Sequence, residues 1–420
     1  MRQDLDRLMA QTDLDGLWIS GHAGDNPALD YFVGGAHLTH ADLFKKRGEP
    51  PILYHRRMER DEAERTGLRT ALHDEADYAR WLESTGGDSL QADALRIRNA
   101  LQAEGMSGRI AVLGRIDAGY ALDLVRHLEA LAPESSFMSD GGDDSVLARA
   151  RATKDPSEIE RIRLTGRITV EVVEQIARFL QARPVEGSTL LTDDRSPLTV
   201  GAVKRRIHLL LAERGAESPS GPIFAIGREG AIGHSVGLDD DLVELGRPIV
   251  FDIYPRLIGG GYYFDFTRTW CLGFAPEPVQ TLYDQVLTVY YEIFPMMVAG
   301  GSPKQIQVET CRRFEAQGHP TLLSDMATEQ GYFHGLAHGL GLAIHEPPFF
   351  RHTAAKDAYR LQPGMVVTFE PGLYYPDQDM GVRLEDTLLI TEKGPAEVLV
   401  PYPHDLVLPM THPVGSAAHE

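Results

Sequence analysis

The sequence is poor in cysteine. Only Cys271 and Cys311 occur among 420 residues, which excludes a disulfide framework and a zinc site built from cysteines. Any metal that the protein binds must therefore be held by oxygen and nitrogen ligands.

Long hydrophobic runs and an excess of positive charge are also missing. No apolar run approaches the roughly 20 residues that a membrane span needs, and residues 1–15 resemble a charged amphipathic helix without the apolar core of an export signal. The 61 acidic and 41 basic residues give a formal charge of −20, which repels the phosphates of nucleic acids. We expect a cytoplasmic protein with neither a membrane nor a nucleic-acid partner.

What is present is the composition of a globular protein, with 43% hydrophobic and 24% charged residues. At about 100–200 residues per domain, this length predicts two domains, which we place at 1–150 and 151–420. The first alternates short apolar runs with helical stretches and is predicted to be an α/β layer. Its expected elements are strands at 16–20, 51–54 and 109–113, a helix at 118–131 and a loop at 84–93.

A helix start marks the second domain. In Asp155-Pro156-Ser157-Glu158, Asp155 can cap the helix, Pro156 suits its first turn, and Glu158 can reach back to the cap. A mixture of further helices and strands predicts an α+β domain. The expected helices are 203–214, 279–298 and 303–317, and the expected strands are 248–254, 262–271, 365–370 and 382–391, with a glycine-rich turn over 256–261 that joins the first two strands as a hairpin.

Four acidic residues interrupt strands that are otherwise suited to burial. Asp252 lies in the apolar run 249–253, where a lone ionised carboxylate is costly unless it is paired or binds a metal. Asp265 follows in the returning strand, so the hairpin can bring both carboxylates to one face of a sheet. Glu370 ends another strand and Glu385 interrupts a fourth. This pattern predicts a cation-binding cluster.

His338 can add an imidazole to this cluster, because it lies in a glycine-rich segment, residues 334–341, where the backbone can approach closely. Four carboxylates and one imidazole suit two divalent ions such as manganese, with cobalt, iron or zinc as alternatives. Taken singly, each residue has an ordinary alternative, such as an acid on the wet face of a strand or a hydrogen-bonded polar histidine. Spacing alone leaves open whether the five side chains converge.

Six segments resemble, in order, the motifs of the pita-bread metallopeptidases, and most closely those of the branch of Xaa-Pro aminopeptidases and Xaa-Pro dipeptidases (prolidases). The resemblance covers about residues 150–410, and the part before it resembles the smaller creatinase-type domain of that branch. It implies a catalytic domain with a curved antiparallel sheet. The six segments are Phe251-Asp252-Ile253-Tyr254, residues 261–269, His338-Gly339-Leu340-Gly341, His345-Glu346-Pro347-Pro348, residues 369–374 and residues 381–386.

The resemblance implies a role for each metal ligand. Asp265 and Glu385 would bridge two metal ions, of which manganese is the expected kind. Asp252 would complete the coordination of one ion, and His338 with Glu370 would complete the coordination of the other. Glu370 would also be the general acid/base beside a hydroxide that bridges the ions.

The resemblance further implies residues that act on the substrate. His234 matches a histidine that binds substrate near the scissile bond, and His345 matches one that contacts the peptide or its tetrahedral intermediate. His334 matches a further histidine of the proline-specific branch. Arg383 matches an arginine that can hold a carboxylate in a bidentate fork, although it could instead brace Glu370 or Asp386. Thr267 is expected to orient a ligand.

The implied function is hydrolysis of the Xaa-Pro bond, at the N-terminus of peptides or in dipeptides, by attack of the metal-bridging hydroxide. The alternatives are hydrolysis of another small amide on the same fold, and a non-catalytic binding homologue, which would lack ligands that are all present here. The family habit implies a homodimer. The stretch from Asp252 to Asp265 is longer than in most members, so the usual substrate preference does not transfer directly.

Overall fold

The computed structural model describes residues 4–353 and 360–411. The chain forms two compact units, one made of the residues up to Arg151 together with Gly259–Gly261, and the other of the remaining residues. Within the described residues, no helix is long and apolar enough to cross a membrane.

The first unit is built on a mixed sheet of six strands in the order β4-β3-β2-β1-β5-β6. Strand β1 pairs antiparallel with β2 and parallel with β5. Because side chains alternate across a strand, the neighbours Trp18 and Ile19 lie in two different apolar clusters, one for each face. The strands are β1 (Gly16–Gly21), β2 (Ala41–Lys46), β3 (Ile52–His55), β4 (Arg69–Leu72), β5 (Gly108–Arg115) and β6 (Ser135–Ser139).

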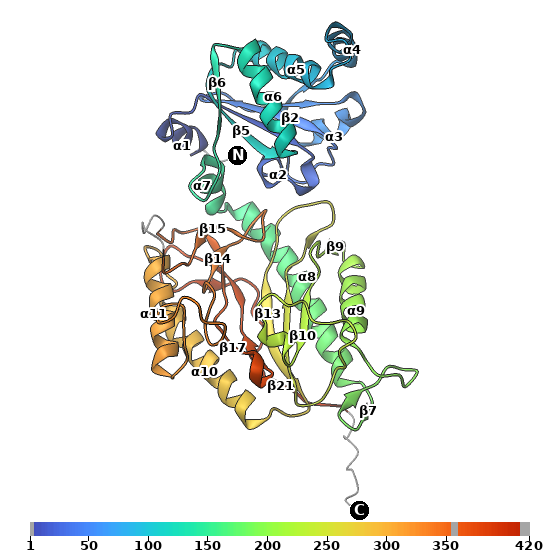
Figure 1. The fold of residues 1–420 in the computed structure, drawn as a ribbon, viewed down its shortest axis with the longest axis vertical. Helices are drawn as coiled ribbons and strands as arrows, with labels where there is room; N and C mark the ends of the chain where they lie inside the picture. Colours follow the sequence, from blue (N-terminus) through green and yellow to red (C-terminus); the bar gives the residue numbers. More distant parts are fainter. Residues whose placement is uncertain (1–3, 354–359, 412–420) are drawn as a thin grey trace, which may run out of the picture. The chain divides into compact units, whose positions relative to one another are not determined.

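The helices of this unit (Figure 1) contribute the remaining buried side chains of both apolar clusters. Helices α1 (Leu5–Gln11), α2 (Pro27–Val33), α3 (Arg60–Arg65) and α7 (Val146–Ala152) contribute to the cluster of Ile19, whereas α5 (Ser89–Ala103) and α6 (Ala118–Leu131) contribute to that of Trp18. The predicted α/β layer is confirmed, and the predicted helix at 118–131 is α6.

The predicted loop at 84–93 is confirmed only at residues 85–88, and residues 89–93 are helical instead. Helix α4 (Glu75–Ser84) ends where the loop was expected to begin, and α5 starts at Ser89. The Asp88 carboxylate accepts hydrogen bonds from the backbone N–H groups of Leu90 (3.0 Å) and Gln91 (3.1 Å). The polar residues that suggested a loop are therefore a helix cap and the exposed face of α5.

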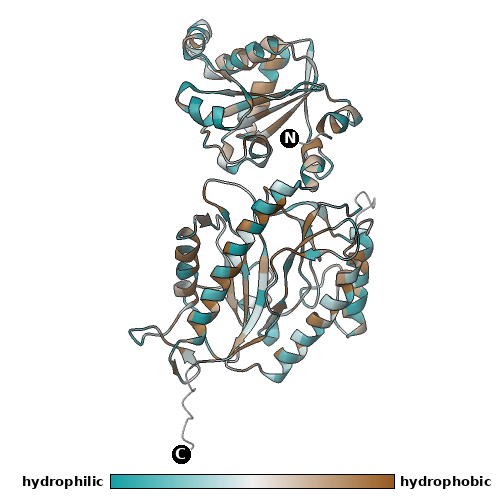
Figure 2. Cartoon of the chain, turned by 180° about the vertical axis from the view of Figure 1, so that it is seen from behind, coloured by the Kyte–Doolittle hydropathy of each residue, from teal (hydrophilic) through white to brown (hydrophobic). Residues whose placement is uncertain are grey.

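The second unit begins with the predicted helix. In α8 (Pro156–Gln181), the Asp155 side chain accepts from the backbone N–H groups of Ser157 and Glu158, and the Glu158 side chain accepts from the backbone N–H of Asp155, which completes a capping box. The other predicted helices are α9 (Val200–Ala212), α10 (Glu277–Ile293) and α11 (Pro303–Ala316). Hydrophilic and hydrophobic residues both occur along these helices (Figure 2), and each helix buries apolar side chains, such as Ile162 of α8, Ile207 of α9 and Val286 of α10.

Two antiparallel-rich sheets and a hairpin form the strand layer of this unit. The four-stranded sheet has the order β10 (Ile223–Ile226), β11 (Pro248–Ile253), β13 (Phe266–Leu272) and β21 (Val407–Leu408). The five-stranded sheet has the order β15 (Glu346–Phe349), β14 (His338–Gly339), β16 (Val366–Phe369), β19 (Asp386–Leu389) and β20 (Glu397–Val398). The hairpin is β17 (Gly372–Tyr375) with β18 (Met380–Arg383).

Two strand predictions need correction. The expected strand at 382–391 is broken, because β18 pairs with β17 up to Arg383 whereas β19 pairs with β16 from Asp386 onwards. Glu385 lies in the break, where it forms a bridge with Thr267 of β13. The expected hairpin turn at 256–261 is also more than a turn, since Arg256–Leu257 forms β12 and pairs with β9 (Ala216–Glu217).

Candidate metal and substrate site

The two sheets and the segments next to them present acidic residues to one cavity of about 1040 Å³ in the second unit, and the hairpin adds Tyr374 and Arg383. On the four-stranded sheet, Asp252 of β11 lies opposite Thr267 of β13. Asp265 comes two residues before Thr267, so the alternation of a strand turns both carboxylates toward the same face. The predicted approach of Asp265 to Asp252 follows from this register, but the predicted strand at 262–271 begins only at Phe266, so Asp265 lies just before the returning strand.

The five-stranded sheet brings a histidine against these acids. The N–H at Nδ1 of His338 donates to the backbone oxygen of Gly339 (3.1 Å), which leaves Nε2 as the acceptor nitrogen. That nitrogen lies 3.7 Å from Asp265 Oδ2 and 3.4 Å from Glu370 Oε1. Burial, with a smaller contribution from His345, lowers the pKa of His338 to about 3. The imidazole is therefore neutral, as a metal ligand must be.

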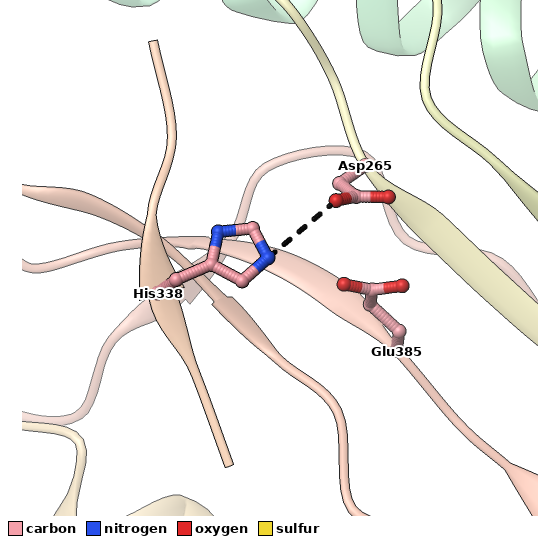
Figure 3. Close-up of side chains that lie close together, drawn as sticks. All are labelled: Asp265, His338 and Glu385. Carbon is pink, nitrogen blue, oxygen red and sulfur yellow. Dashed lines mark ion pairs between the residues drawn. The ribbon is translucent and has the colours of Figure 1, made fainter. Parts of the chain in front are cut away.

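Asp265, His338 and Glu385 form a group that can hold a cation (Figure 3). One ligand atom from each lies within 4.8 Å of the others, and all three side chains are buried. The Thr267 hydroxyl donates to Glu385 Oε2 (2.6 Å), which orients this carboxylate as the sequence suggested. Glu370 and Asp252, the other two predicted ligands, line the same cavity.

The acids of this cavity fit a bound cation better than a metal-free state. Burial and mutual repulsion raise the pKa of Asp265 and of Glu385 well above their ordinary values. In addition, Asp252 Oδ1 is buried without a hydrogen-bond partner among the described residues. Repelling carboxylates and an unpartnered oxygen are both relieved by a divalent ion, so the donor set fits the predicted metals.

Glu370 differs from its neighbours in being partly accessible. Its side chain is 16% exposed, and the Thr368 hydroxyl donates to Oε1 (3.2 Å). Burial and the nearby Asp252 raise the pKa of Glu370 to about 8, against the opposing attraction of Arg383. A carboxyl group with this pKa can exchange a proton near neutral pH.

Three histidines line the cavity beside the acids. His345 is exposed and packs edge to face on His338, with 4.4 Å between ring centroids. His234 is likewise exposed. His334 is half-buried and lies 3.9 Å from Glu370 Oε2, and burial together with Arg383 lowers its pKa to about 3. The exposure of His345 and His234 leaves both free to meet a ligand.

Arg383 is held inside the protein. Its guanidinium is 6% exposed and donates to Asp252 Oδ2 (2.6 Å), to the Tyr374 hydroxyl (2.9 Å) and to Thr267 Oγ1 (3.4 Å). A substrate carboxylate would have to compete with these bonds. The carboxylate that this arginine braces is Asp252.

Sequence reasoning did not single out Tyr254, Tyr374 or the apolar wall of the cavity. Tyr254 could have been found, because it follows Asp252 by two residues and a strand turns such pairs to one face. The apolar wall comes from segments far apart in sequence, so no local pattern reveals it. Its larger members are Ile223, Val236, Phe333, Ile344, Phe349 and Phe350.

A buried arginine forms hydrogen bonds with the segments next to Asp265 and Glu385. Arg268 is fully buried and uses its five N–H donors, from Nε to the Pro403 oxygen, from one terminal nitrogen to the Thr267 and Glu385 oxygens, and from the other to Asp386 Oδ1 and the Tyr402 oxygen. Although burial opposes ionisation of Asp386, Arg268 and hydrogen bonds from His404 and Tyr290 hold the pKa of that carboxyl below its ordinary value.

We expect Arg268→Lys to destabilise the fold strongly, because an ammonium has three donors and cannot replace the planar set of five. Breaking a buried ion pair typically costs about 3–5 kcal/mol, so the free energy of unfolding in urea should fall by at least about 2 kcal/mol even with partial replacement. Arg178→Lys is the control, since that side chain is 69% exposed. A loss equal to that of the control would contradict the structural role of Arg268.

The fold and the acid-rich cavity define a class, that of hydrolases in which clustered carboxylates and a histidine hold divalent ions. The family model of Metallopeptidase family M24 matches residues 160–392, and the chain belongs to this family. The Xaa-Pro dipeptidase of Pyrococcus furiosus is 30% identical over 256 residues, which are 60% of this chain and 64% of that relative. The alignment thus spans less than two thirds of the curated relative's length.

Solved structures confirm the predicted fold class. The prolidase of Pyrococcus horikoshii superposes with a TM-score of 0.71 at 23% identity, covering 96% of this chain and 99% of that one. An X-Pro aminopeptidase from Thermotoga maritima superposes with a TM-score of 0.72 at 20% identity, with the same coverage. At these identities the likeness establishes the pita-bread fold and the N-terminal domain that precedes it.

Proposed function

We propose that the protein is a metal-dependent peptidase that hydrolyses the bond between the first residue of a peptide and a following proline. The observation that carries the proposal is the convergence of Asp265, His338 and Glu385 in one cavity, with Asp252 and Glu370 on its wall. The named activity of the Pyrococcus furiosus relative supports the choice of substrate.

In the proposal, Asp252, Asp265, His338, Glu370 and Glu385 hold two divalent ions, with manganese as the expected metal. When bound, such ions activate water and polarise the scissile carbonyl. We further propose a homodimer in the cytoplasm.

The protein's own groups then carry the proton and position the peptide. Glu370 accepts the proton released as water attacks and passes it to the leaving proline nitrogen, a role that its position beside His338 and its partial exposure support. His345 and His234 contact the peptide. His334 lines the cavity beside Glu370 and is oriented by a hydrogen bond from the Tyr374 hydroxyl (3.2 Å).

The test is a matched peptide series assayed with manganese-loaded protein. We expect Leu-Pro or Leu-Pro-Gly to be cleaved with a kcat/KM at least about tenfold above that of Leu-Ala or Leu-Ala-Gly, a difference of about 1.4 kcal/mol in transition-state binding. Comparison of the dipeptide with the tripeptide separates a dipeptidase from an aminopeptidase. Faster cleavage of the alanine peptides, or no cleavage of either proline peptide, would refute the proposal.

A further inference from the structure

Tyr254 occupies the wall of the cavity next to a proposed metal ligand. It follows Asp252 by two residues at the end of β11, so its side chain points to the same face, and both residues line the cavity. Two residues of extended chain span about 6.6 Å. A group bound at Tyr254 therefore lies about one substrate residue from the bond that would react at the acids.

The hydroxyl of Tyr254 is available to a ligand. The other tyrosine of the cavity, Tyr374, accepts from Arg383 (2.9 Å) and bonds with His334 Nε2 (3.2 Å), so its hydroxyl is committed within the protein. The Tyr254 hydroxyl has no such bond anywhere in 4–353 or 360–411, although the side chain is half-buried. A phenol hydroxyl can both donate and accept a hydrogen bond.

The neighbours of Tyr254 form a small apolar surface on this wall. Ile223 of β10 is the register partner of Asp252, and Ile223 also lines the cavity. Asp252 is thus flanked by Ile223 across the sheet and by Tyr254 along the strand. This surface can accept an apolar side chain of a ligand, and the Tyr254 hydroxyl lies beside it.

The chemistry of an Xaa-Pro peptide decides which end of it meets this wall. The proline nitrogen has no N–H once it is in the peptide bond, and its ring is apolar. The first residue instead offers the hydrogens of its α-amino group and a variable side chain. A free hydroxyl next to an apolar surface matches the first residue.

We propose that Tyr254 is a specificity-determining residue that contacts the first residue of the peptide, with its hydroxyl bonded to the α-amino group and its ring packed, together with Ile223, against the side chain. This inference rests on the proposed function. The inference adds to that function the part of the substrate that Tyr254 contacts.

Product inhibition tests the contact, because cleavage of Leu-Pro releases the two halves separately. For Tyr254→Phe, we expect the inhibition constant of leucine to rise about 2- to 12-fold, the range of one neutral hydrogen bond, while that of proline stays the same. The KM for Leu-Pro should rise by a similar factor and kcat should change less than about twofold, since the contact exists before and during reaction. Tyr291→Phe is the control, because that side chain is 59% exposed and lies outside the cavity lining.

A second variant tests the ring. Tyr254→Ala should reduce the preference for Leu-Pro over Ala-Pro at least about threefold, since the ring no longer packs on the larger side chain. If the inhibition constant of leucine is unchanged in Tyr254→Phe, or if that of proline rises instead, the inference is overturned while the proposed function stands. Wild-type protein that cleaves no Xaa-Pro peptide would instead overturn the proposed function, and the inference with it.

Discussion

Replacing Glu370 by Gln should lower turnover on an Xaa-Pro peptide at least about 100-fold even when the metals are fully bound, because general acid–base help is typically worth about 10²–10⁴-fold. Glu370 is asked to hold a metal and to carry a proton. An amide oxygen can still coordinate a metal, though more weakly, but the amide cannot exchange a proton at neutral pH.

The geometry makes Glu370 the group to test. Its Oε1 lies 3.4 Å from His338 Nε2, and its Oε2 lies 3.9 Å from His334 Nδ1. Burial raises its pKa to about 8 in the metal-free protein. A bound cation favours the ionised form and brings this pKa down, so the carboxylate is ready to accept a proton at neutral pH.

The measurement is kcat together with metal content on the same sample. Glu397→Gln is the control, because that carboxylate is 45% exposed and pairs with Arg163 instead of facing the cavity. If Glu370→Gln with two metals bound kept more than about a tenth of wild-type turnover, which is far above the expected range, Glu370 would be a ligand only. The proton would then pass through His334 or His345.

Removal of the metals should abolish hydrolysis altogether, and manganese should restore it. Without cations, burial and repulsion from neighbouring carboxylates, among them Asp252 and Glu370, raise the pKa of Asp265 and of Glu385. Metal binding relieves this repulsion, so it should also raise the melting temperature; occupancy at 100 times Kd contributes about 2.7 kcal/mol.

Metal analysis after loading and dialysis should approach two ions per chain. Asp265→Ala is the matched variant, since it removes one member of the Asp265–His338–Glu385 group and should not recover activity when manganese is added back. Loaded wild-type protein that contains no metal, or hydrolysis that persists in chelator, would contradict the metal-dependent mechanism.

Local sequence patterns predict those parts of the structure that depend on residues close together in the chain. The start of α8 is fixed by Asp155, Pro156 and Glu158 within one turn, and the structure contains that capping box. The loop predicted at 84–93 extended too far, because a polar helix cap at Asp88 and a polar helix face look the same as a loop in composition.

Local sequence patterns do not predict contacts between segments that are far apart in the chain. The break at Glu385 arises because the chain leaves the β17–β18 hairpin and joins β16, and nothing in the run from Val382 to Thr391 signals that exchange. The bond from Arg383 to Asp252 joins residues 131 apart. A sequence reveals such a partner only through resemblance to a family.

The residue types along the chain already reveal which chemistry is present: four acids in or next to apolar strands and a glycine-flanked histidine, in a chain too poor in cysteine to bind metal through sulfur. Only the tertiary structure shows that Asp265, His338 and Glu385 meet within 4.8 Å, that Arg383 donates to Asp252, and that the Tyr254 hydroxyl lines the cavity without a partner among the described residues. The physical reason is that residue type and local periodicity are encoded along the chain, whereas convergence depends on strand register and on which sheet each segment joins.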